Sequence, residues 1–385
     1  MLINRLVLKN LLSFRDTTIE LRNLNVLIGP NAVGKSNLIE AISLLQSAQS
    51  SLSNAILRGG GVGQWVWLGD RESSPVAEMI CDLELTRGPH VGPVRYSIQF
   101  TDNHGLAIVG ERVEGIDSEV VYLNRISGRV EFGAEAIKKG PPQPEMFTSP
   151  ADSVLSQFRS LSDPTPVTEV GNHLSKIRTY REFRTGPQSG ARYGISTSVS
   201  KDALTDGSDN LAMVLQQLDF LASPHERIRA YLKRFCERFK DVKVEVAEGF
   251  ARAVLREEGL EDLSSVRMSD GTLKFLSLLA ALFYPKLPPL MCIEEPEIGL
   301  HPDALQLVAE ALLEASESTQ LIVTTHSEAL VDALSHRPDT VLVCERDFDN
   351  GTQMKPLSKD DLKEWLEEYS LGELWRKGEI GGGRW

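Results

Sequence analysis

The chain has 385 residues, of which 41% are hydrophobic and 25% are charged, and its 41 basic and 54 acidic side chains give a net charge of −13. This composition is typical of a globular protein of two or three domains and excludes disordered chains, collagen and coiled-coil rods. The acidic balance argues against binding nucleic acid through bulk charge, although it leaves room for a local basic face.

The first part of the chain predicts a strand, a glycine-bearing loop and a helix in that order. Residues 25–28 form a short apolar run that ends at Gly29, and apolar residues at helical spacing begin after Asn37. A flexible GGGVG sequence follows at 59–63, and three alternating stretches within 76–133 then predict a β-rich lobe. Pro-rich connections are expected at 140–150 and 162–166.

The second part of the chain predicts helices over 209–240, a strand over 242–246, and alternating helices and strands over 269–345. Such alternation is typical of an α/β layer, and no heptad pattern predicts long coiled-coil arms. We therefore expect an α/β fold. Residues 1–58 and 208–345 would form the two parts of its core, 59–207 an inserted β-rich and helical lobe, and 346–385 a C-terminal tail.

The loop after the strand at 25–28 matches GxxxxGK[ST], in the strand-to-helix context of a nucleotide-binding P-loop. Glycines let the backbone fold around phosphates, and amides at the helix start face the anion. Lys35 would reach the β- and γ-phosphates, and the Ser36 hydroxyl would be a ligand of Mg²⁺. The predicted nucleotide-binding residues are Gly29, Pro30, Asn31, Ala32, Val33, Gly34, Lys35, Ser36 and Asn37.

Two later apolar runs also end at polar side chains. Residues 290–293 stop at Glu294 and Glu295, and residues 321–325 stop at His326. Ligands of α/β sheets bind at the carboxyl ends of the strands. We therefore expect one carboxylate to lie in the Mg²⁺ shell and the next to orient or deprotonate an attacking water. His326 would hydrogen-bond a γ-phosphate.

A short polar sequence precedes the apolar helix predicted over 273–283. Ser269, Asp270 and Gly271 would leave free N–H groups at the start of this helix and form a second anion site. An ordinary N-cap fits the same residues equally well.

The order of these motifs resembles the ABC-type ATPase domain of the RecF and SMC group. The phrases IGPNxxGKSN, SDGT, EEPExGLHP and TTHS are similar to those of compact OLD-like AAA family ATPases, over about residues 1–45 and 260–345. The resemblance implies a P-loop NTPase core that hydrolyses ATP with Mg²⁺, and two subunits that sandwich two ATP molecules head to tail. The C-terminal sequence from Leu371 to Trp385 also looks like an ending seen in that group.

The same resemblance implies roles for individual residues. Residues 29–36 would be the Walker A motif with a catalytic Lys35, and 269–272 the signature loop whose Ser269, Asp270 and Gly271 cap the nucleotide of the partner. Glu294 would be the Walker B metal ligand and Glu295 the catalytic glutamate. Residues 299–302 would be the D-loop, and His326 the switch histidine.

Three positions depart from the pattern of that family. Glu294 stands in place of the usual Walker B aspartate, Asp270 stands where glycine is common, and no glutamine occupies an evident Q-loop. Gln64, after the GGGVG sequence, is our candidate for that metal-binding position, with Gln99 as a second candidate.

A basic and aromatic stretch occupies the middle of the chain. Its basic residues are Lys176, Arg178, Arg181, Arg184 and Arg192. Such a stretch can follow a phosphate backbone and stack bases, which makes it a candidate nucleic-acid site. The same residues also fit a solvated loop, ion pairs within the protein, or a docking site for an acidic partner protein.

The sequence predicts a cytoplasmic protein without a membrane partner. Its four cysteines are far apart and form no CxxC pair, which favours a reducing compartment. No apolar run approaches the roughly 18 residues of a membrane span, and the first residues lack the pattern of a signal peptide.

Two functions follow from these predictions. The first is a slow ATPase that dimerises on ATP and couples closure to DNA maintenance or sensing. The alternative is an ATP-driven regulatory subunit that holds or releases an effector such as a nuclease or toxin, for example in anti-phage defence.

Overall fold

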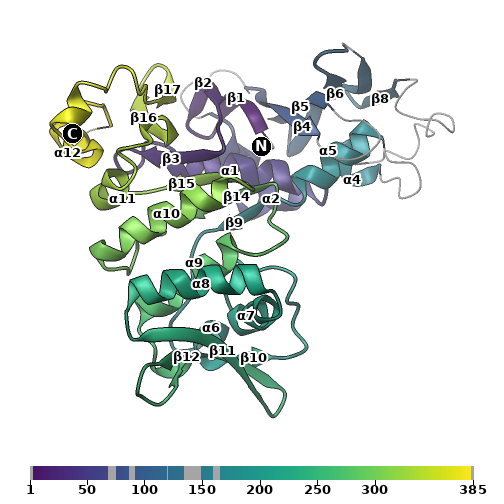
Figure 1. The fold of residues 1–385 in the computed structure, drawn as a ribbon. Helices are drawn as coiled ribbons and strands as arrows, with labels where there is room; N and C mark the ends of the chain where they lie inside the picture. The colour runs from purple at the N-terminus through teal and green to yellow at the C-terminus, as the bar shows by residue number, and fades with distance from the viewer. Residues whose placement is uncertain are drawn as a thin grey trace. The chain divides into compact units, whose positions relative to one another are not determined.

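The computed structural model describes residues 3–67, 75–85, 92–118, 120–133, 149–158 and 165–382. The chain forms two compact units (Figure 1), which are described separately. Unit 1 comprises Met1–Ile177, Leu342–Leu357 and Ile380–Trp385, and unit 2 comprises Arg178–Val341 and Ser358–Glu379. The four-segment division at 58, 207 and 345 stays a prediction. The two predicted Pro-rich connections and the last three residues lie partly or wholly outside the described residues.

Unit 1 is built on a sheet whose strands follow the order β8-β7-β6-β5-β4-β1-β2-β17-β16-β3. The pairs from β2 through β1 and β4 to β8 are antiparallel. Buried and half-buried residues alternate along β4 and β5, as expected for strands with one face in the core. The β-rich lobe predicted within 76–133 is therefore confirmed. The strands are β1 (Ile3–Leu11), β2 (Phe14–Glu20), β3 (Leu24–Ile28), β4 (Ala77–Leu85), β5 (Gly92–Asp102), β6 (Leu106–Gly115), β7 (Val121–Ile126), β8 (Arg129–Phe132), β16 (Val341–Asp347) and β17 (Gly351–Pro356).

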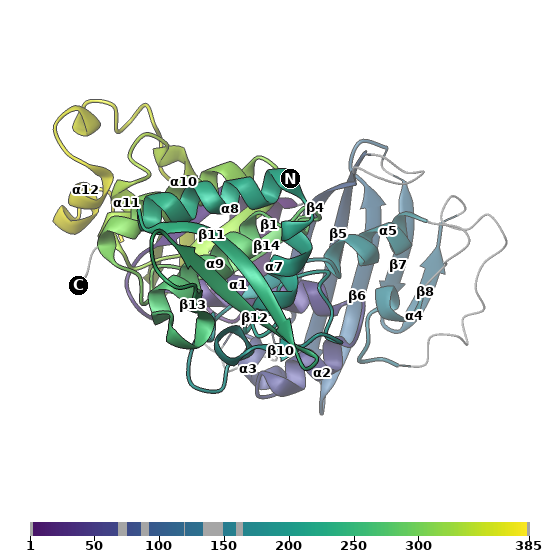
Figure 2. The same ribbon diagram turned by 60° about the horizontal axis from the view of Figure 1, so that its bottom comes forward.

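The helices of unit 1 are α1 (Lys35–Ser47), α2 (Leu52–Arg58), α3 (Val62–Trp65), α4 (Val154–Gln157) and α5 (Pro166–Leu174). In α1 the apolar residues at helical spacing are fully buried, as the sequence pattern predicts. Helix α5 contacts β4 and β7 and so covers one face of the lobe (Figure 2).

A buried polar network ties the start of α4 to the lobe sheet. The carboxylate of Glu111 on β6 accepts hydrogen bonds from Tyr96 Oη (2.9 Å), Ser153 Oγ (2.5 Å) and the backbone N–H of Val154 (2.8 Å). Arg125 on β7 lies 3.8 Å from the same carboxylate. Glu111 is only 2% exposed and Arg125 only 4%. Burial raises the pKa of Glu111, and its hydrogen bonds and Arg125 oppose that rise.

Unit 2 contains the parallel strands β15, β14 and β9, in that order across the sheet. The apolar residues of β14 and β15 are fully buried, which is typical of parallel strands. Their bounds are β9 (Arg178–Tyr180), β14 (Leu290–Glu294) and β15 (Gln320–Thr324), and the helices of this part are α9 (Asp270–Leu282), α10 (Leu305–Ser316), α11 (Glu328–Asp332) and α12 (Leu371–Lys377).

A second, smaller sheet in unit 2 has the order β10-β12-β11, with β13 paired to β12. Helices α7 and α8 contact β11. The elements are α6 (Gly190–Tyr193), β10 (Ile195–Ser196), α7 (Leu211–Asp219), α8 (Ala222–Phe235), β11 (Phe239–Ala247), β12 (Phe250–Glu257) and β13 (Leu263–Ser264).

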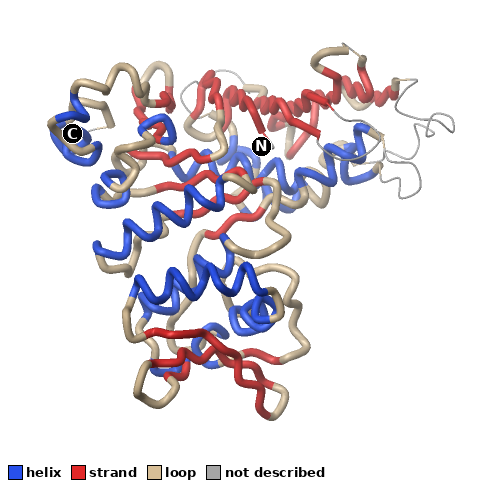
Figure 3. The backbone as a smooth tube through the Cα atoms, in the orientation of Figure 1, coloured by secondary structure: helices blue, strands red, loops and turns tan. Residues whose placement is uncertain are grey.

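The predicted α/β fold class is confirmed, with helices and strands mixed in both units (Figure 3). Helix α8, with 14 residues, is far too short for a coiled-coil arm, and no longer helix occurs in the described ranges. Within those same ranges, no helix combines the length and the apolar character needed to cross a lipid bilayer.

Candidate functional site

The P-loop of unit 1 adopts backbone conformations that its glycines make accessible. Gly34 has a φ of 109°, in the region that favours glycine, and it ends the loop directly before α1. A Cβ at Gly34 would collide with Thr352 Oγ1, and one at Gly29 with the carbonyl oxygen of Cys344. Ala32 also has a positive φ, of 61°. The loop is thus a closely packed cradle between β3 and α1.

Lys35 lies across this cradle. Its Nζ donates hydrogen bonds to the carbonyl oxygens of Gly29 (2.7 Å) and Pro30 (2.9 Å), and the residue is 6% exposed. The ammonium group is therefore held at the loop by carbonyl acceptors, which phosphate oxygens of a nucleotide can replace.

Thr352 on β17 supports the same loop, a role that the sequence did not reveal. Its Oγ1 donates to the carbonyl oxygen of Val33 (2.6 Å) and lies 2.7 Å from Ser13 Oγ, while its N–H donates to the carbonyl oxygen of Ser13 (2.8 Å). Thr352 is fully buried. No sequence pattern distinguishes it, because its partners lie more than 300 positions away.

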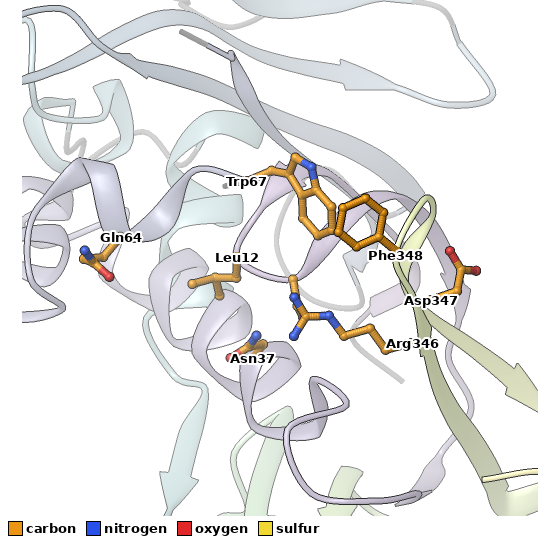
Figure 4. A pocket seen from close by; sticks show the side chains of 8 residues that line it. Leu12, Asn37, Gln64, Trp67, Arg346, Asp347 and Phe348 are labelled. Atoms are coloured by element: carbon orange, nitrogen blue, oxygen red, sulfur yellow. The ribbon is translucent and has the colours of Figure 1, made fainter. Parts of the chain in front are cut away.

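A cavity of about 610 Å³ opens beside the P-loop helix (Figure 4). The rings of Trp67 and Phe348 lie next to each other on one side, and the Arg346 guanidinium extends between them and Asn37. Arg346 also donates a 3.4 Å hydrogen bond to the carbonyl oxygen of Ala32 in the P-loop. Aromatic rings and a planar guanidinium are groups on which a nucleobase can stack.

The two glutamine candidates occupy different places in unit 1. Gln64, on α3, lines the cavity of Figure 4 at the end away from Phe348. Gln99, on β5, donates a 2.6 Å hydrogen bond to Glu78 on the neighbouring strand. The metal-binding role of Gln64 stays a prediction.

In unit 2, Glu295 and His326 come together at the carboxyl ends of β14 and β15. Glu295 Oε1 lies 3.8 Å from His326 Nε2, and both side chains are about one-third exposed. Glu295 has a φ of 44°, and its N–H donates to the carbonyl oxygen of Thr324 (3.0 Å). A non-glycine residue in this region carries backbone strain, which is concentrated at functional sites.

Glu297 positions the backbone of His326, and the sequence analysis assigned it no role. Its Oε1 accepts hydrogen bonds from Thr325 Oγ1 (2.7 Å) and from the N–H of His326 (2.8 Å). Burial raises the pKa of this carboxyl. The signal available in the sequence was its place in the Glu-Glu-Pro-Glu phrase after β14.

The basic stretch does not form one uniform surface. Arg178 is an exposed residue of β9, whereas Arg181 follows the end of that strand and lies 3.6 Å from Glu294 Oε1 on β14. Arg184 lies 3.9 Å from Asp209 Oδ2. Lys176 is exposed and belongs to unit 1. A nucleic-acid role of these residues stays a prediction.

Arg192 has a different role, because its guanidinium holds the loop that precedes α9. It donates to the carbonyl oxygens of Val266 (3.0 Å) and Met268 (2.8 Å) and to Asp270 Oδ1 (2.7 Å). The pairing lowers the pKa of Asp270. Ser269 caps α9 by accepting the N–H of Thr272 (3.1 Å). The negative charge of Asp270, which stands where glycine is common, is thus balanced by the positive charge of Arg192.

The family described as "AAA domain, putative AbiEii toxin, Type IV TA system" matches residues 24–332. The chain belongs to this AAA domain family. The matched range contains the P-loop, the loop held by Arg192, and the ends of β14 and β15. Family membership supports ATPase activity at the level of the family.

Two curated relatives match short segments of this AAA domain protein. Old nuclease of Escherichia phage P2 is 38% identical over 80 residues, which are 20% of this chain and 12% of that protein. The DNA replication and repair protein RecF of Acetivibrio thermocellus is 42% identical over 78 residues, 19% of this chain and 21% of that protein. The match thus spans about a fifth or less of either relative.

Solved SMC heads share the fold over nearly the whole chain. A SmcHead bound to the C-winged helix domain of ScpA has a TM-score of 0.58 and 13% identity, covering 94% of this chain and 99% of that one. An Smc head domain bound to the C-terminal domain of ScpA, from a structure derived from Pyrococcus furiosus, has a TM-score of 0.58 and 12% identity, covering 95% and 99%. The AAA domain therefore has the P-loop ATPase fold of the RecF and SMC group.

The family implies ATP and Mg²⁺, and the residues present fit them. Mg²⁺ in such proteins takes one or two protein oxygen ligands, keeps water ligands, and is bound mainly through phosphates of the nucleotide. In unit 1, the Ser36 hydroxyl at the start of α1 is an oxygen donor of this kind. The metal-binding role of Glu294 stays a prediction. The glycine-shaped cradle and its lysine fit the phosphates.

The pairing of Arg192 with Asp270 leads to a testable prediction. We expect Arg192→Ala to lower ATP turnover about tenfold or more, because the charge-assisted hydrogen bonds of the guanidinium are lost and the Asp270 carboxylate is left uncompensated. Adding Asp270→Gly should restore part of the loss, since it removes that charge. Initial rates at saturating ATP, with thermal unfolding as the control for folding, test this. Equal losses in the single and double variants would show that charge compensation is unimportant.

Proposed function

We propose that this AAA domain protein binds ATP with Mg²⁺, hydrolyses it slowly, and closes into a head-to-tail dimer around two nucleotides. The observation that carries the proposal is the strained Glu295 beside His326 at the ends of parallel strands, in a chain that also has a P-loop with a buried lysine. Hydrolysis would be slow because the signature loop that completes each site comes from the partner.

Each residue has a distinct role in this proposal. Lys35 and the P-loop amides hold the phosphates, and Ser36 and Glu294 hold Mg²⁺, which neutralises phosphate charge when bound. Glu295 accepts a proton from the attacking water, and His326 donates a hydrogen bond to the γ-phosphate. Ser269, Asp270 and Gly271 of one subunit face the γ-phosphate of the other.

We propose DNA as the coupled ligand. The support is the similarity to a protein named for DNA replication and repair and to one named a nuclease, together with the exposed basic residues Lys176, Arg178 and Arg181. The second candidate is control of an effector protein, and the family's description as a toxin of a type IV TA system favours it.

One set of measurements tests both the ATPase dimer and its coupling to DNA. In wild-type protein, ATP turnover per subunit should rise with protein concentration and rise again with duplex or single-stranded DNA. Lys35→Ala should lose about two orders of magnitude in ATP affinity, because phosphate contacts with a charged donor are worth ~1.5–3 kcal/mol each. The measurements are steady-state turnover and equilibrium nucleotide binding.

The possible results distinguish the nucleotide site, the dimer and the coupled ligand. Wild-type ATP affinity in Lys35→Ala would overturn the P-loop assignment. Turnover independent of protein concentration would count against the dimer. Turnover that ignores DNA would leave the ATPase intact and favour the effector protein.

A further inference from the structure

The C-terminal helix α12 lies in unit 2, against a helix that starts beside the proposed catalytic edge. It belongs to the C-terminal sequence, Leu371 to Trp385, that looks like an ending seen in the OLD-like group. Helix α12 packs on α11 (Figure 1). The N-cap of α11 is Ser327, the residue that directly follows His326.

The start of α12 is fixed by its own sequence. Ser370 and Glu373 form a capping box, in which the Ser370 side chain accepts the N–H of Glu373 and the Glu373 side chain accepts the N–H of Ser370. Two further backbone N–H groups at this end donate to side chains that lie outside α12. The N–H of Leu371 donates to Ser335 Oγ (2.9 Å), and that of Gly372 donates to Asp332 Oδ1 (2.7 Å).

Gly372 allows the two helices to meet at backbone distance. A Cβ at this position would lie 2.5 Å from Asp332 Oδ1 and 2.6 Å from the carbonyl oxygen of Glu328. Glu328 is the first residue of α11 and Asp332 the last, so the close approach extends along the whole of this short helix. Arg376 lies 3.5 Å from the Glu328 side chain and adds a contact at the end of α11 nearest His326.

Apolar side chains complete the contact. Leu371 and Leu374 of α12 are fully buried and Trp375 is 6% exposed, while Leu330 and Val331 of α11 are fully buried. These buried apolar contacts fix the position of α12 against α11.

The backbone around His326 is therefore held on two sides. Glu297 binds the N–H of His326 on one side. On the other, Ser327 caps α11 by accepting the N–H of Leu330 (3.3 Å), and α12 holds α11 in place. We propose that α12, through Gly372, is a positioning element that sets the place of His326 for hydrolysis of ATP. This inference rests on the proposed ATPase function.

The test is Gly372→Ala, whose methyl group must push α11 away from α12. Displacing a catalytic group by about 1 Å can cost 10²-fold in rate. We expect kcat to fall at least tenfold while the Kd for ATP stays as in wild type, because the P-loop is untouched. The control is Lys377→Ala, an exposed position on the same helix, for which wild-type kcat is expected.

A double variant distinguishes positioning from a general loss of structure. In a His326→Ala background, Gly372→Ala should cause no further loss, since the group that it displaces is already gone. Single-turnover rates with enzyme in excess keep such slow variants measurable. A further loss of tenfold in that background would overturn the role through His326.

Folding is checked separately. If Gly372→Ala does not fold, Ser370→Ala weakens the cap of α12 without adding bulk, and it should produce the same split between kcat and Kd to a smaller extent. Wild-type kcat in a folded Gly372→Ala would overturn this inference alone. Absence of ATP binding and turnover in the wild-type protein would overturn the proposed function instead.

Discussion

Glu295→Gln is expected to lower ATP turnover by about 10²–10⁴-fold while ATP binding is retained, because removal of a general base costs that much. Glutamine keeps the size and the Cβ of the residue, so the backbone at φ 44° is equally strained in the variant. The substitution removes the negative charge and, with it, the ability to accept a proton from the water. Turnover and equilibrium ATP binding measure the two effects.

The same substitution should trap the closed dimer with ATP and Mg²⁺, which light scattering detects. Glu317→Gln, at an exposed position after α10, is the matched control and should behave as wild type. A Glu295→Gln protein that hydrolyses ATP at the wild-type rate would remove this glutamate from the chemistry. A protein that stays monomeric with ATP would argue against the sandwich.

The second large effect is expected in the lobe of unit 1. Arg125→Met should destabilise the protein by about 3–5 kcal/mol, because it leaves the buried Glu111 carboxylate without its opposite charge. The control is Arg129→Met, which breaks an exposed ion pair with Glu131 (3.0 Å) and should cost at most about 1 kcal/mol. Chemical unfolding gives both free energies.

The loss of folding stability in Arg125→Met should depend on pH. The pKa of Glu111 is raised by burial in the folded protein, and without Arg125 it rises further. A carboxyl with a raised folded pKa contributes stability that is present below its unfolded pKa and is lost as the pH rises through the folded value. The difference between variant and wild type should therefore be largest at neutral pH and shrink toward pH ~4, near the unfolded pKa of glutamate. A difference independent of pH would show that Glu111 is not the cause.

The features that the sequence predicted correctly are local in the chain. A P-loop joins one strand to the next helix, so its pattern and its structural context lie within about twenty residues of each other. The same holds for the places of Glu294 and Glu295 at the end of β14 and of His326 after β15, because each follows its own apolar run. The roles of these residues stay predictions. These short patterns were enough for the α/β fold class and for the order of the motifs.

The features that the sequence did not reveal depend on distant partners. In the sequence, Arg192 cannot be distinguished from the other basic residues of the same stretch. Only the fold brings its guanidinium to the carbonyl oxygens of Val266 and Met268. Glu297 and Thr352 likewise act through residues on other elements. Charge and spacing alone cannot separate an arginine that binds its own chain from one that faces a ligand.

The support of the P-loop by Thr352 has a consequence for biosynthesis. Strand β3 and the loop after it emerge from the ribosome more than 300 residues before β17. Contacts of such long sequence separation form late in folding, and domains assemble as the chain is made. The nascent protein thus lacks this support for its P-loop until β17 has been made. Nucleotide binding should be acquired only after β17 has joined the sheet, and a chain interrupted before β17 would have the P-loop sequence without a finished site.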